Sequence, residues 1–280
     1  MQEIKTINNG ILEVKVSNIG GELQSIKDIE TGREYLHNGD EKWWTGRAPN
    51  LFPVVGRLKN DCYTYNGKTY KMAQHGFIRK NPMVTFEASQ NYVTHKRAAD
   101  KDTFDMYPFD FEFYITHRLK DRSLFVSYTV VNNGDTSMPF SVGAHPAFAA
   151  KLGDKILLKG KDSLNYKSIE GGLVLPDKHE TGNTLILDED LFKNDVLIFE
   201  ESQLSSVSLA DGNAEYLEIK FDIFPYCGIW SKPCAPFVCL EPWFGVADSV
   251  DATGEIVDKK GIIILPPKES FFAELEIILK

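Results

Sequence analysis

The segment Leu217–Ile223 reads Leu-Glu-Ile-Lys-Phe-Asp-Ile, so apolar and charged residues alternate at every position. A period of two places the apolar side chains on one face of an extended chain and the charged ones on the other, which is typical of a half-buried β-strand. The same period occurs at Leu12–Ser17 and across residues 271–279. These three segments predict strands near both ends of the chain.

Sequences typical of turns separate further β-rich runs. The runs are Phe111–Thr116, Leu124–Val131, Val196–Phe199 and Gly261–Leu265. The turns are Asn9-Gly10, Asn66-Gly67, residues 132–135 and residues 211–213. Helical periodicity is scarce: Asp40–Trp44 is a candidate for one helical turn, and neither a dinucleotide-binding glycine motif nor a P-loop occurs. We therefore predict an all-β fold, a large antiparallel β-sandwich formed by one domain over residues 1–280.

The composition excludes several classes of protein. Of 280 residues, 42% are hydrophobic and 12% aromatic, which is enough for a large core and excludes a disordered chain. The net charge of −9 argues against general nucleic-acid binding. No apolar run is long enough to cross a bilayer, and the first residues lack the apolar core of a signal peptide. We expect a cytoplasmic protein with no membrane partner, present as a monomer or a homodimer.

Cysteine and histidine spacing does not indicate a metal site or a disulfide framework. The cysteines are unpaired in spacing, and we expect reduced, mostly buried thiols at Cys62, Cys227, Cys234 and Cys239. Four histidines lie in polar or turn contexts and are expected to be structural or exposed: His37, His95, His117 and His179. No His-x-His or His-Glu-x-x-His motif occurs, so neither a metal nor another cofactor is expected.

Two segments place a basic side chain beside a glycine. Arg57 follows a glycine in an apolar stretch, where its charge needs an anionic or multi-acceptor partner unless it is a surface arginine at a strand end. His75 precedes a glycine, which predicts a ring that is approachable from one side; a histidine hydrogen-bonded in a turn fits equally well. Arg79 and Lys80 follow, either as solvated charges or as a local anion site.

The segment 139–148 places a second histidine among small residues. If it is a strand, Ser141, Gly143 and His145 share one face. That face has little bulk, which predicts open space beside the imidazole. Pro146 holds His145 extended and lacks an amide donor, as suits the end of a strand. A core histidine with a satisfied partner is the competing interpretation, and we favour the functional one.

The segment 236–245 places a carboxylate among apolar neighbours. Glu241 is flanked by Leu240 and Pro242, and such surroundings raise a carboxylate pKa toward the range useful for a general base. Trp243 offers a face on which a sugar ring can stack. A buried glutamate in an ion pair is the alternative. Cys239 shares the strand face of Glu241, and a packed thiol is the better interpretation of it.

Together these segments resemble the aldose 1-epimerase (galactose mutarotase-like) family. The resemblance spans nearly the whole chain and rests on Arg57 in V-V-G-R-L-K-N, His75 in Q-H-G-F-I-R, His145 in G-A-H-P-A-F and Glu241 in L-E-P-W-F-G-V-A-D, in the family's order. The chain is most similar to the uncharacterised branch encoded with lactose and tagatose genes in Gram-positive bacteria. The resemblance implies a large "supersandwich" with an open sugar-binding cleft.

The resemblance also implies roles for these residues. Glu241 is the expected general base for the anomeric O1 proton, and His145 the general acid for the ring oxygen. Arg57 and His75 are expected to bind sugar hydroxyls. The family has a sugar-binding aspartate, for which Asp195 is the best match although its local motif departs from that of the true mutarotases, with Asp222 as a competitor. The implied activity is interconversion of the α and β anomers of a hexose without a metal or redox cofactor.

Three alternatives remain open from the sequence. A hexose-6-phosphate mutarotase would need extra cations at the cleft, which Arg79, Lys80 or Lys232 could supply. A sugar-binding or sensing protein without catalysis would not need both His145 and Glu241. A glycoside hydrolase is disfavoured, because it would use two carboxylates.

Overall fold

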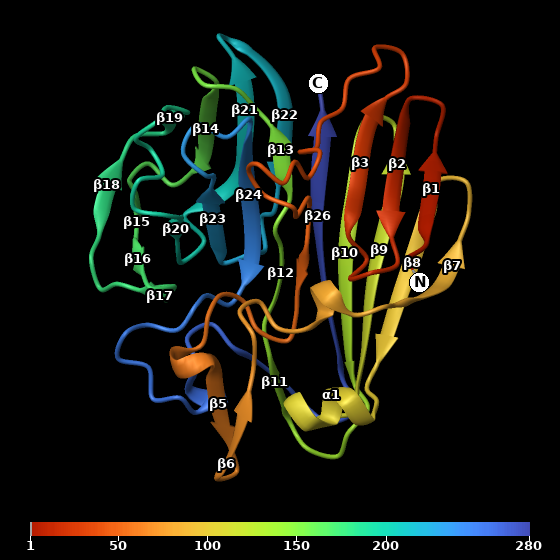
Figure 1. Cartoon of the computed structure of the whole chain (residues 1–280), viewed down its shortest axis with the longest axis vertical. Helices are drawn as coiled ribbons and strands as arrows, with labels where there is room; N and C mark the ends of the chain where they lie inside the picture. Colours follow the sequence, from red (N-terminus) through yellow and green to blue (C-terminus); the bar gives the residue numbers. More distant parts are fainter. Residues whose placement is uncertain (1) are drawn as a thin grey trace.

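Antiparallel strands dominate the protein in a computed structural model, which describes residues 2–280 (Figure 1). The largest sheet has nine strands in the order β19-β14-β21-β22-β26-β10-β9-β8-β7. In that order they are β19 (Thr184–Ile186), β14 (Lys155–Gly160), β21 (Leu204–Asp211), β22 (Ala214–Lys220), β26 (Ser270–Leu279), β10 (Ser123–Asn132), β9 (Phe111–Lys120), β8 (Tyr92–Ala98) and β7 (Val84–Ala88). The segment Leu217–Ile223 begins in β22, beside the C-terminal strand β26, but the strand ends at Lys220 rather than Ile223.

Two smaller sheets accompany the nine-stranded one. The six-stranded sheet consists of β20 (Leu197–Phe199), β23 (Tyr226–Trp230), β24 (Phe237–Phe244), β12 (Val142–Ala144) and β4 (Asn50–Leu51), with β13 (Ala147–Ala149) also paired to β24. The three-stranded sheet consists of β1 (Ile4–Asn8), β2 (Leu12–Ser17) and β3 (Leu23–Asp28). The predicted turn at Asn9-Gly10 joins β1 to β2.

Short paired strands and helical turns complete the chain. The pairs are β11 (Met138–Phe140) with β25 (Ile263–Leu265), β15 (Leu164–Tyr166) with β18 (His179–Thr181), β16 (Ile169–Glu170) with β17 (Leu173–Val174), and β5 (Cys62–Tyr65) with β6 (Lys68–Lys71). The helical elements are α1 (Lys101–Met106) and the 3₁₀ turns η1 (Lys59–Asp61), η2 (Ile78–Lys80) and η3 (Ile256–Asp258). Asp40–Trp44, the candidate for one helical turn, is a hydrogen-bonded turn and not an α-helix: the backbone N–H groups of Trp43 and Trp44 both donate to the Asp40 carbonyl over 2.9 Å.

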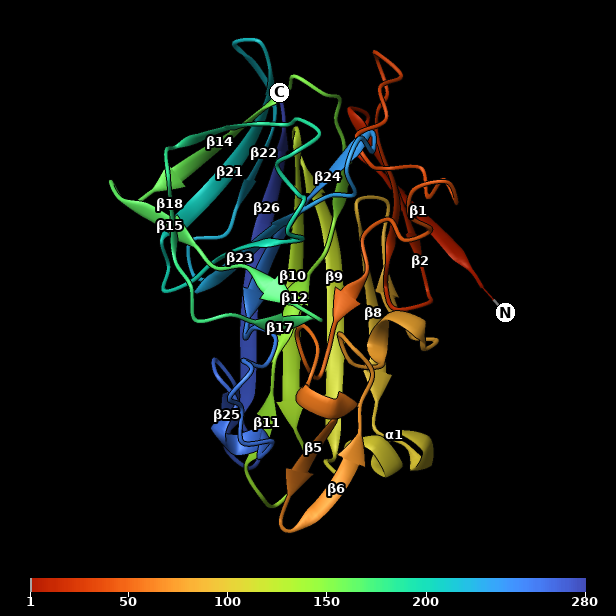
Figure 2. The ribbon, with the colours of Figure 1, turned by 60° about the vertical axis from the view of Figure 1, so that its left-hand side comes forward.

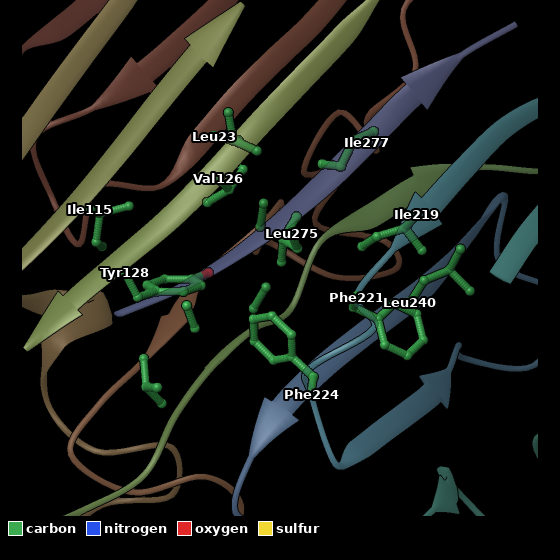
Figure 3. Close-up of a cluster of buried hydrophobic side chains, with 14 of the residues drawn as sticks. Leu23, Ile115, Val126, Tyr128, Ile219, Phe221, Phe224, Leu240, Leu275 and Ile277 are labelled. Atoms are coloured by element: carbon green, nitrogen blue, oxygen red, sulfur yellow. The ribbon is translucent and has the colours of Figure 1, made fainter. Parts of the chain in front are cut away.

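The core lies against one face of the nine-stranded sheet. Figure 3 shows Ile115, Val126 and Leu275, from β9, β10 and β26, in one cluster with Leu23 of β3 and Leu240 of β24. The three- and six-stranded sheets therefore cover the same face, as a sandwich requires. Because side chains alternate along a strand, the face of β24 opposite Leu240 points away from this core.

The outer face of the six-stranded sheet is the one that carries the polar residues described below. Figure 1 places the β16–β17 pair near β20 and β23, and Figure 2 shows β17 near β23 from a second direction. The predicted all-β antiparallel fold is confirmed; the prediction of one domain remains a prediction. Within residues 2–280, no helix is long and apolar enough to cross a membrane.

Candidate active site

Strand register brings His145 opposite Glu241. β12 pairs Gly143 with Trp243, and β13 pairs Ala147 with Cys239, so the same antiparallel register continues across the break between the two short strands. His145 occupies that break. Its Nε2 lies 3.2 Å from Oε2 of Glu241. Two residues far apart in the sequence are thus held together by the backbone pairing of β24.

A cleft of about 470 Å³ lies above this pair. Its floor is formed by β24 and β23, and its wall includes the β16–β17 pair and the loop after β4. All six site residues predicted from the sequence line this cleft: Arg57, His75, His145, Asp195, Glu241 and Trp243. Asp222 is exposed and lies outside the cleft lining, so the structure places Asp195 rather than its competitor beside the other five.

Burial shifts the pKa values of His145 and Glu241 in opposite directions. It lowers the pKa of His145 to about 3, with a smaller lowering from the charge of Arg79. It raises the pKa of Glu241 well above its usual range; the charge of Asp195 adds to the rise, and the Trp243 indole opposes it. The pair therefore holds one exchangeable proton between a carboxyl and an imidazole at neutral pH. Such a pair can supply one acid and one base together.

A fixed tautomer of His75 faces the cleft. His75 lies in the left-handed region, with φ of 66°, and its Nδ1 accepts a hydrogen bond of 3.1 Å from the Gly56 N–H. The neutral ring therefore carries its proton on Nε2. Burial lowers the pKa of His75 well below its usual value, and nearby His145 and Arg79 lower it further. The ring stays neutral, and its Nε2 lies 3.3 Å from the side-chain amide of Gln74, another cleft residue.

The glycine after His75, Gly76, is needed for backbone packing. A Cβ on Gly76 would lie 2.1 Å from the carbonyl oxygen of Phe52, so the missing side chain permits a close backbone approach. The His75 ring itself lines the cleft. The hydrogen bond from Gly56 instead fixes how the ring is presented.

Arg57 joins two parts of the cleft wall. Its Nε and Nη2 each donate to the Asp61 carboxylate over 2.8 Å, and its Nη1 donates to the Gly171 carbonyl over 3.0 Å. The anionic partner expected from the sequence is therefore present within the chain. The guanidinium side chain is 42% exposed and also lines the cleft. Arg57 thus holds the β16–β17 turn over the cleft while keeping donors at its edge.

The space beside Gly143 is filled, whereas His145 lines the cleft. A Cβ on Gly143 would lie 2.5 Å from Trp243 Cδ1, and a Cβ on Gly228 would lie 2.3 Å from Trp243 Cη2. These two glycines make room for the indole of Trp243, which is 4% exposed. The small residues do leave room on this face, as predicted, but the Trp243 side chain occupies that room. Little of the Trp243 ring is therefore exposed for a sugar to stack on.

Asp195 lies at the exposed edge of the cleft. Its φ is 70°, which turns the chain sharply just before β20. Burial raises the pKa of its carboxyl, and the Val196 N–H and the Trp230 indole oppose that rise. A carboxylate at the entrance can accept hydrogen bonds from hydroxyl groups, and it also acts electrostatically on Glu241.

Comparison with known proteins agrees with this geometry. A family model described as aldose 1-epimerase matches residues 3–205, well over half of the chain. The chain belongs to the aldose 1-epimerase family. The match includes four of the predicted site residues, Arg57, His75, His145 and Asp195, and ends before the strand that carries Glu241.

Individual relatives extend the similarity to almost the full chain. The chain is 31% identical to the protein LacX of Lactococcus lactis over 94% of its length and 95% of the relative's. A galactose mutarotase related enzyme from Lactobacillus acidophilus superposes with a TM-score of 0.95 at 32% identity, covering 99% of this chain and 97% of that one. A galactose mutarotase-like protein from Lactobacillus casei gives 0.94 at 29% identity, over 99% and 100%. The predicted family and its branch are confirmed.

Three cleft residues of this family member were not singled out in the sequence: Trp44, Gln74 and Trp230. Arg79, one of the three residues that the sequence offered as a cation for the cleft, lines it as well. Trp44 stacks on His145 with ring centroids 5.0 Å apart, and Trp230 meets it edge-on. Both tryptophans are partly exposed, so they offer more aromatic surface to the cleft than Trp243. The acidic residues around Trp44 were the misleading signal, because they indicate a surface turn.

Proposed function

We propose that this chain is an aldose 1-epimerase that interconverts the α and β anomers of a hexose. The observation that carries the proposal is the buried pair of His145 and Glu241, 3.2 Å apart on the floor of a cleft. O1 and O5 of a cyclic hexose are bonded to the same carbon. An acid and a base that act on them must therefore be close neighbours.

Ring opening needs a base at O1 and an acid at O5. Glu241 takes the O1 proton, His145 donates to O5, and the C1–O5 bond opens to the aldehyde. Rotation about C1–C2 presents the other carbonyl face, and the reverse transfers close the ring and restore both groups. In the empty cleft burial favours the shared proton on Glu241. Sugar hydroxyls that donate to the carboxylate move that proton to His145, which prepares the productive arrangement.

The surrounding residues position the sugar. His75 donates from Nε2, because its Nδ1 is occupied by the Gly56 N–H. Arg57 and Asp195 offer donors and acceptors at the edge of the cleft. Trp44, stacked on His145, provides an aromatic face beside the reacting centre. Each placed acid or base typically contributes about 10²–10⁴-fold to a rate.

Glu241→Gln tests the proposal. The variant keeps the shape of the side chain but cannot accept the O1 proton, so we expect a loss of mutarotation of about 10²–10⁴-fold with sugar binding largely retained. Polarimetry on freshly dissolved α-hexose measures the rate, and calorimetry measures binding. Glu170→Gln, an exposed glutamate of β16, is the matched control and should behave as wild type. A near wild-type rate in Glu241→Gln would reject the assignment.

A phosphorylated hexose is the second candidate substrate, and Arg79 favours it. Arg79 lines the cleft and its Nε is buried without a hydrogen-bond partner within the described chain. A phosphate would supply the acceptor. Comparison of anomerisation rates for hexoses and their 6-phosphates separates the candidates, and Arg79→Gln should raise the KM of the phosphorylated sugar selectively. Lys80→Gln, beside it on the surface, should leave both KM values unchanged. Equal KM changes for both sugars in Arg79→Gln would refute this candidate.

A further inference from the structure

Three side chains that commonly bind metals meet below the cleft. His145, Cys239 and Glu241, which we call the His-Cys-Glu cluster, place a nitrogen, a sulfur and a carboxylate oxygen within 4.8 Å of one another. All three residues are buried. Among residues 2–280 this is the one group of three such side chains close enough to hold an ion. Sequence spacing could not reveal it, because strand pairing brings His145 to β24 from a distant part of the chain.

The separations in the cluster suit tetrahedral coordination. Two ligands about 2.1 Å from a zinc ion at a tetrahedral angle lie roughly 3.4 Å apart. The His145 nitrogen and the Glu241 oxygen are 3.2 Å apart. A zinc–sulfur bond is longer, about 2.3 Å, so the Cys239 sulfur needs to lie about 3.6 Å from the other two atoms. The Cys239 sulfur lies within 4.8 Å of both atoms, so it is at most about 1 Å too far from each of them.

An unpartnered polar atom in the cluster also points to a ligand. Glu241 is 1% exposed, yet its Oε2 has no hydrogen-bond partner of acceptable geometry among the described residues. Buried polar atoms without partners are costly, by about 1–3 kcal/mol each. His145 and Glu241 also line the cleft, so an ion could reach them and keep an open position for water or a sugar hydroxyl.

We propose that the His-Cys-Glu cluster binds a zinc-like divalent cation, and that the bound ion inhibits the proposed epimerase by occupying its acid and its base. The inference rests on the proposed function only for the inhibition, not for the binding. A sulfur, a nitrogen and an oxygen ligand together favour Zn²⁺ over Mg²⁺ or Ca²⁺, which prefer oxygen ligands alone.

The charge of the filled site is balanced. Cys239 gives up its thiol proton to become a thiolate, the His145–Glu241 pair gives up its shared proton, and both protons pass to solvent. Two negative ligands and one neutral imidazole then neutralise the dication, so no net charge is buried. The carboxylate can no longer accept the O1 proton, and the imidazole has no proton to donate to O5. Inhibition follows without any change of fold.

Metal binding is tested first, independently of activity. Chelator-treated wild-type protein is titrated with Zn²⁺ in competition with a chromophoric chelator, and with Co²⁺ for its absorption spectrum. We expect one ion per chain and a thiolate-to-cobalt charge-transfer band. Cys239→Ala and Cys239→Ser should lose the band and bind Zn²⁺ about 100-fold more weakly or worse, since even partners outside the ligand shell change affinity 10–100-fold. Cys234→Ala, which removes an exposed free thiol, is the matched control and should retain both properties.

Activity gives the second readout. Zn²⁺ should stop mutarotation by the wild type, and a chelator should restore it. Cys239 packs with Ala147 and Phe237 and does not line the cleft. The rate of Cys239→Ser is compared with the rate of the same variant without metal, and Zn²⁺ at a concentration that stops the wild type should leave it unchanged. Zinc affinity that is unchanged in both Cys239 variants, or a cobalt complex without the thiolate band, would overturn the proposal. The binding titrations decide this even if the chain proves to have no epimerase activity.

Discussion

Two buried histidines make the stability of this protein sensitive to mild acid. His117 occupies an inward position of β9 between Ile115 and Leu119, and His95 lies on the neighbouring strand β8. Neither ring has a hydrogen-bond partner at either nitrogen within the described residues. Burial lowers the pKa of His117 to about 3 and that of His95 to about 4. Both rings therefore stay neutral in the folded state at pH values where an unfolded histidine becomes protonated.

The sign and the size of the effect follow from proton linkage. An unfolded histidine titrates near pH 6.5, whereas folded His117 titrates near 3, so the unfolded state binds more protons between these values. The stability that comes from keeping these imidazoles neutral is present above pH 6.5 and is lost as the pH falls below it. From pH 7.5 to 5.0 the unfolded state gains about 2 kcal/mol per histidine, because each pKa unit corresponds to about 1.4 kcal/mol.

Urea denaturation of wild type and His117→Leu at pH 7.5 and 5.0 measures this contribution. At pH 7.5 the two free energies of unfolding should agree within about 1.5 kcal/mol, since leucine has a similar volume and removes two unpartnered nitrogens. Between pH 7.5 and 5.0 the variant should lose about 2 kcal/mol less than wild type. His95→Leu should likewise lose about 2 kcal/mol less free energy of unfolding than wild type over this pH range. In the double variant the two differences should approximately add.

The result that would refute this reasoning is specific. If His117→Leu loses as much free energy of unfolding as wild type between pH 7.5 and 5.0, the imidazole is not held neutral by its burial. The m-value serves as the internal control, because a change in the slope with urea would mean that the unfolded or folded state itself has changed.

Two further predictions concern the cleft. Gly228→Ala should destabilise the protein by about 1–3 kcal/mol, because its Cβ would lie 2.3 Å from the Trp243 ring, and near-ultraviolet circular dichroism should report the displaced indole. Gly182→Ala, where nothing lies within 4 Å, is the matched control, and equal stability of both variants would contradict the packing. Asp195→Asn should move the alkaline limit of mutarotation to lower pH, because the Asp195 charge helps to raise the pKa of Glu241. An unmoved limit would contradict that coupling.

The strands and turns were readable in the sequence because they depend on local patterns. Leu12–Ser17 is a strand with the predicted bounds, and the runs beginning at Phe111 and Leu124 extend to become β9 and β10. The helix α1 was missed: it has six residues, too few to show a helical stripe, and it depends on a capping box between Asp100 and Thr103.

The site was readable in part. His145 and Glu241 could be singled out because each is a polar residue in an apolar segment and directly precedes a proline. The expectation that Glu241 lies at a strand end was wrong, because β24 continues through Pro242 to Phe244. Their separation could not be predicted, because it depends on the register of β12 and β13 against β24. Which group occupies the space beside the small residue Gly143 could not be predicted either: it is the Trp243 side chain and not a ligand. His117 fits an inward position in the alternation of β9, which is a signal that the sequence analysis overlooked.

The interrupted strand that carries His145 separates two tasks. The distance between His145 and Glu241, the proposed acid and base, is fixed by backbone pairing on either side of the interruption, in the interior of a sheet. The walls that a sugar would meet belong to other segments: the turn at Trp44, the β16–β17 pair and the loop before β20. Substrate preference can therefore be redesigned in these peripheral segments while the proton-transfer geometry stays constant. Libraries confined to them should yield altered sugar selectivity far more often than loss of catalysis.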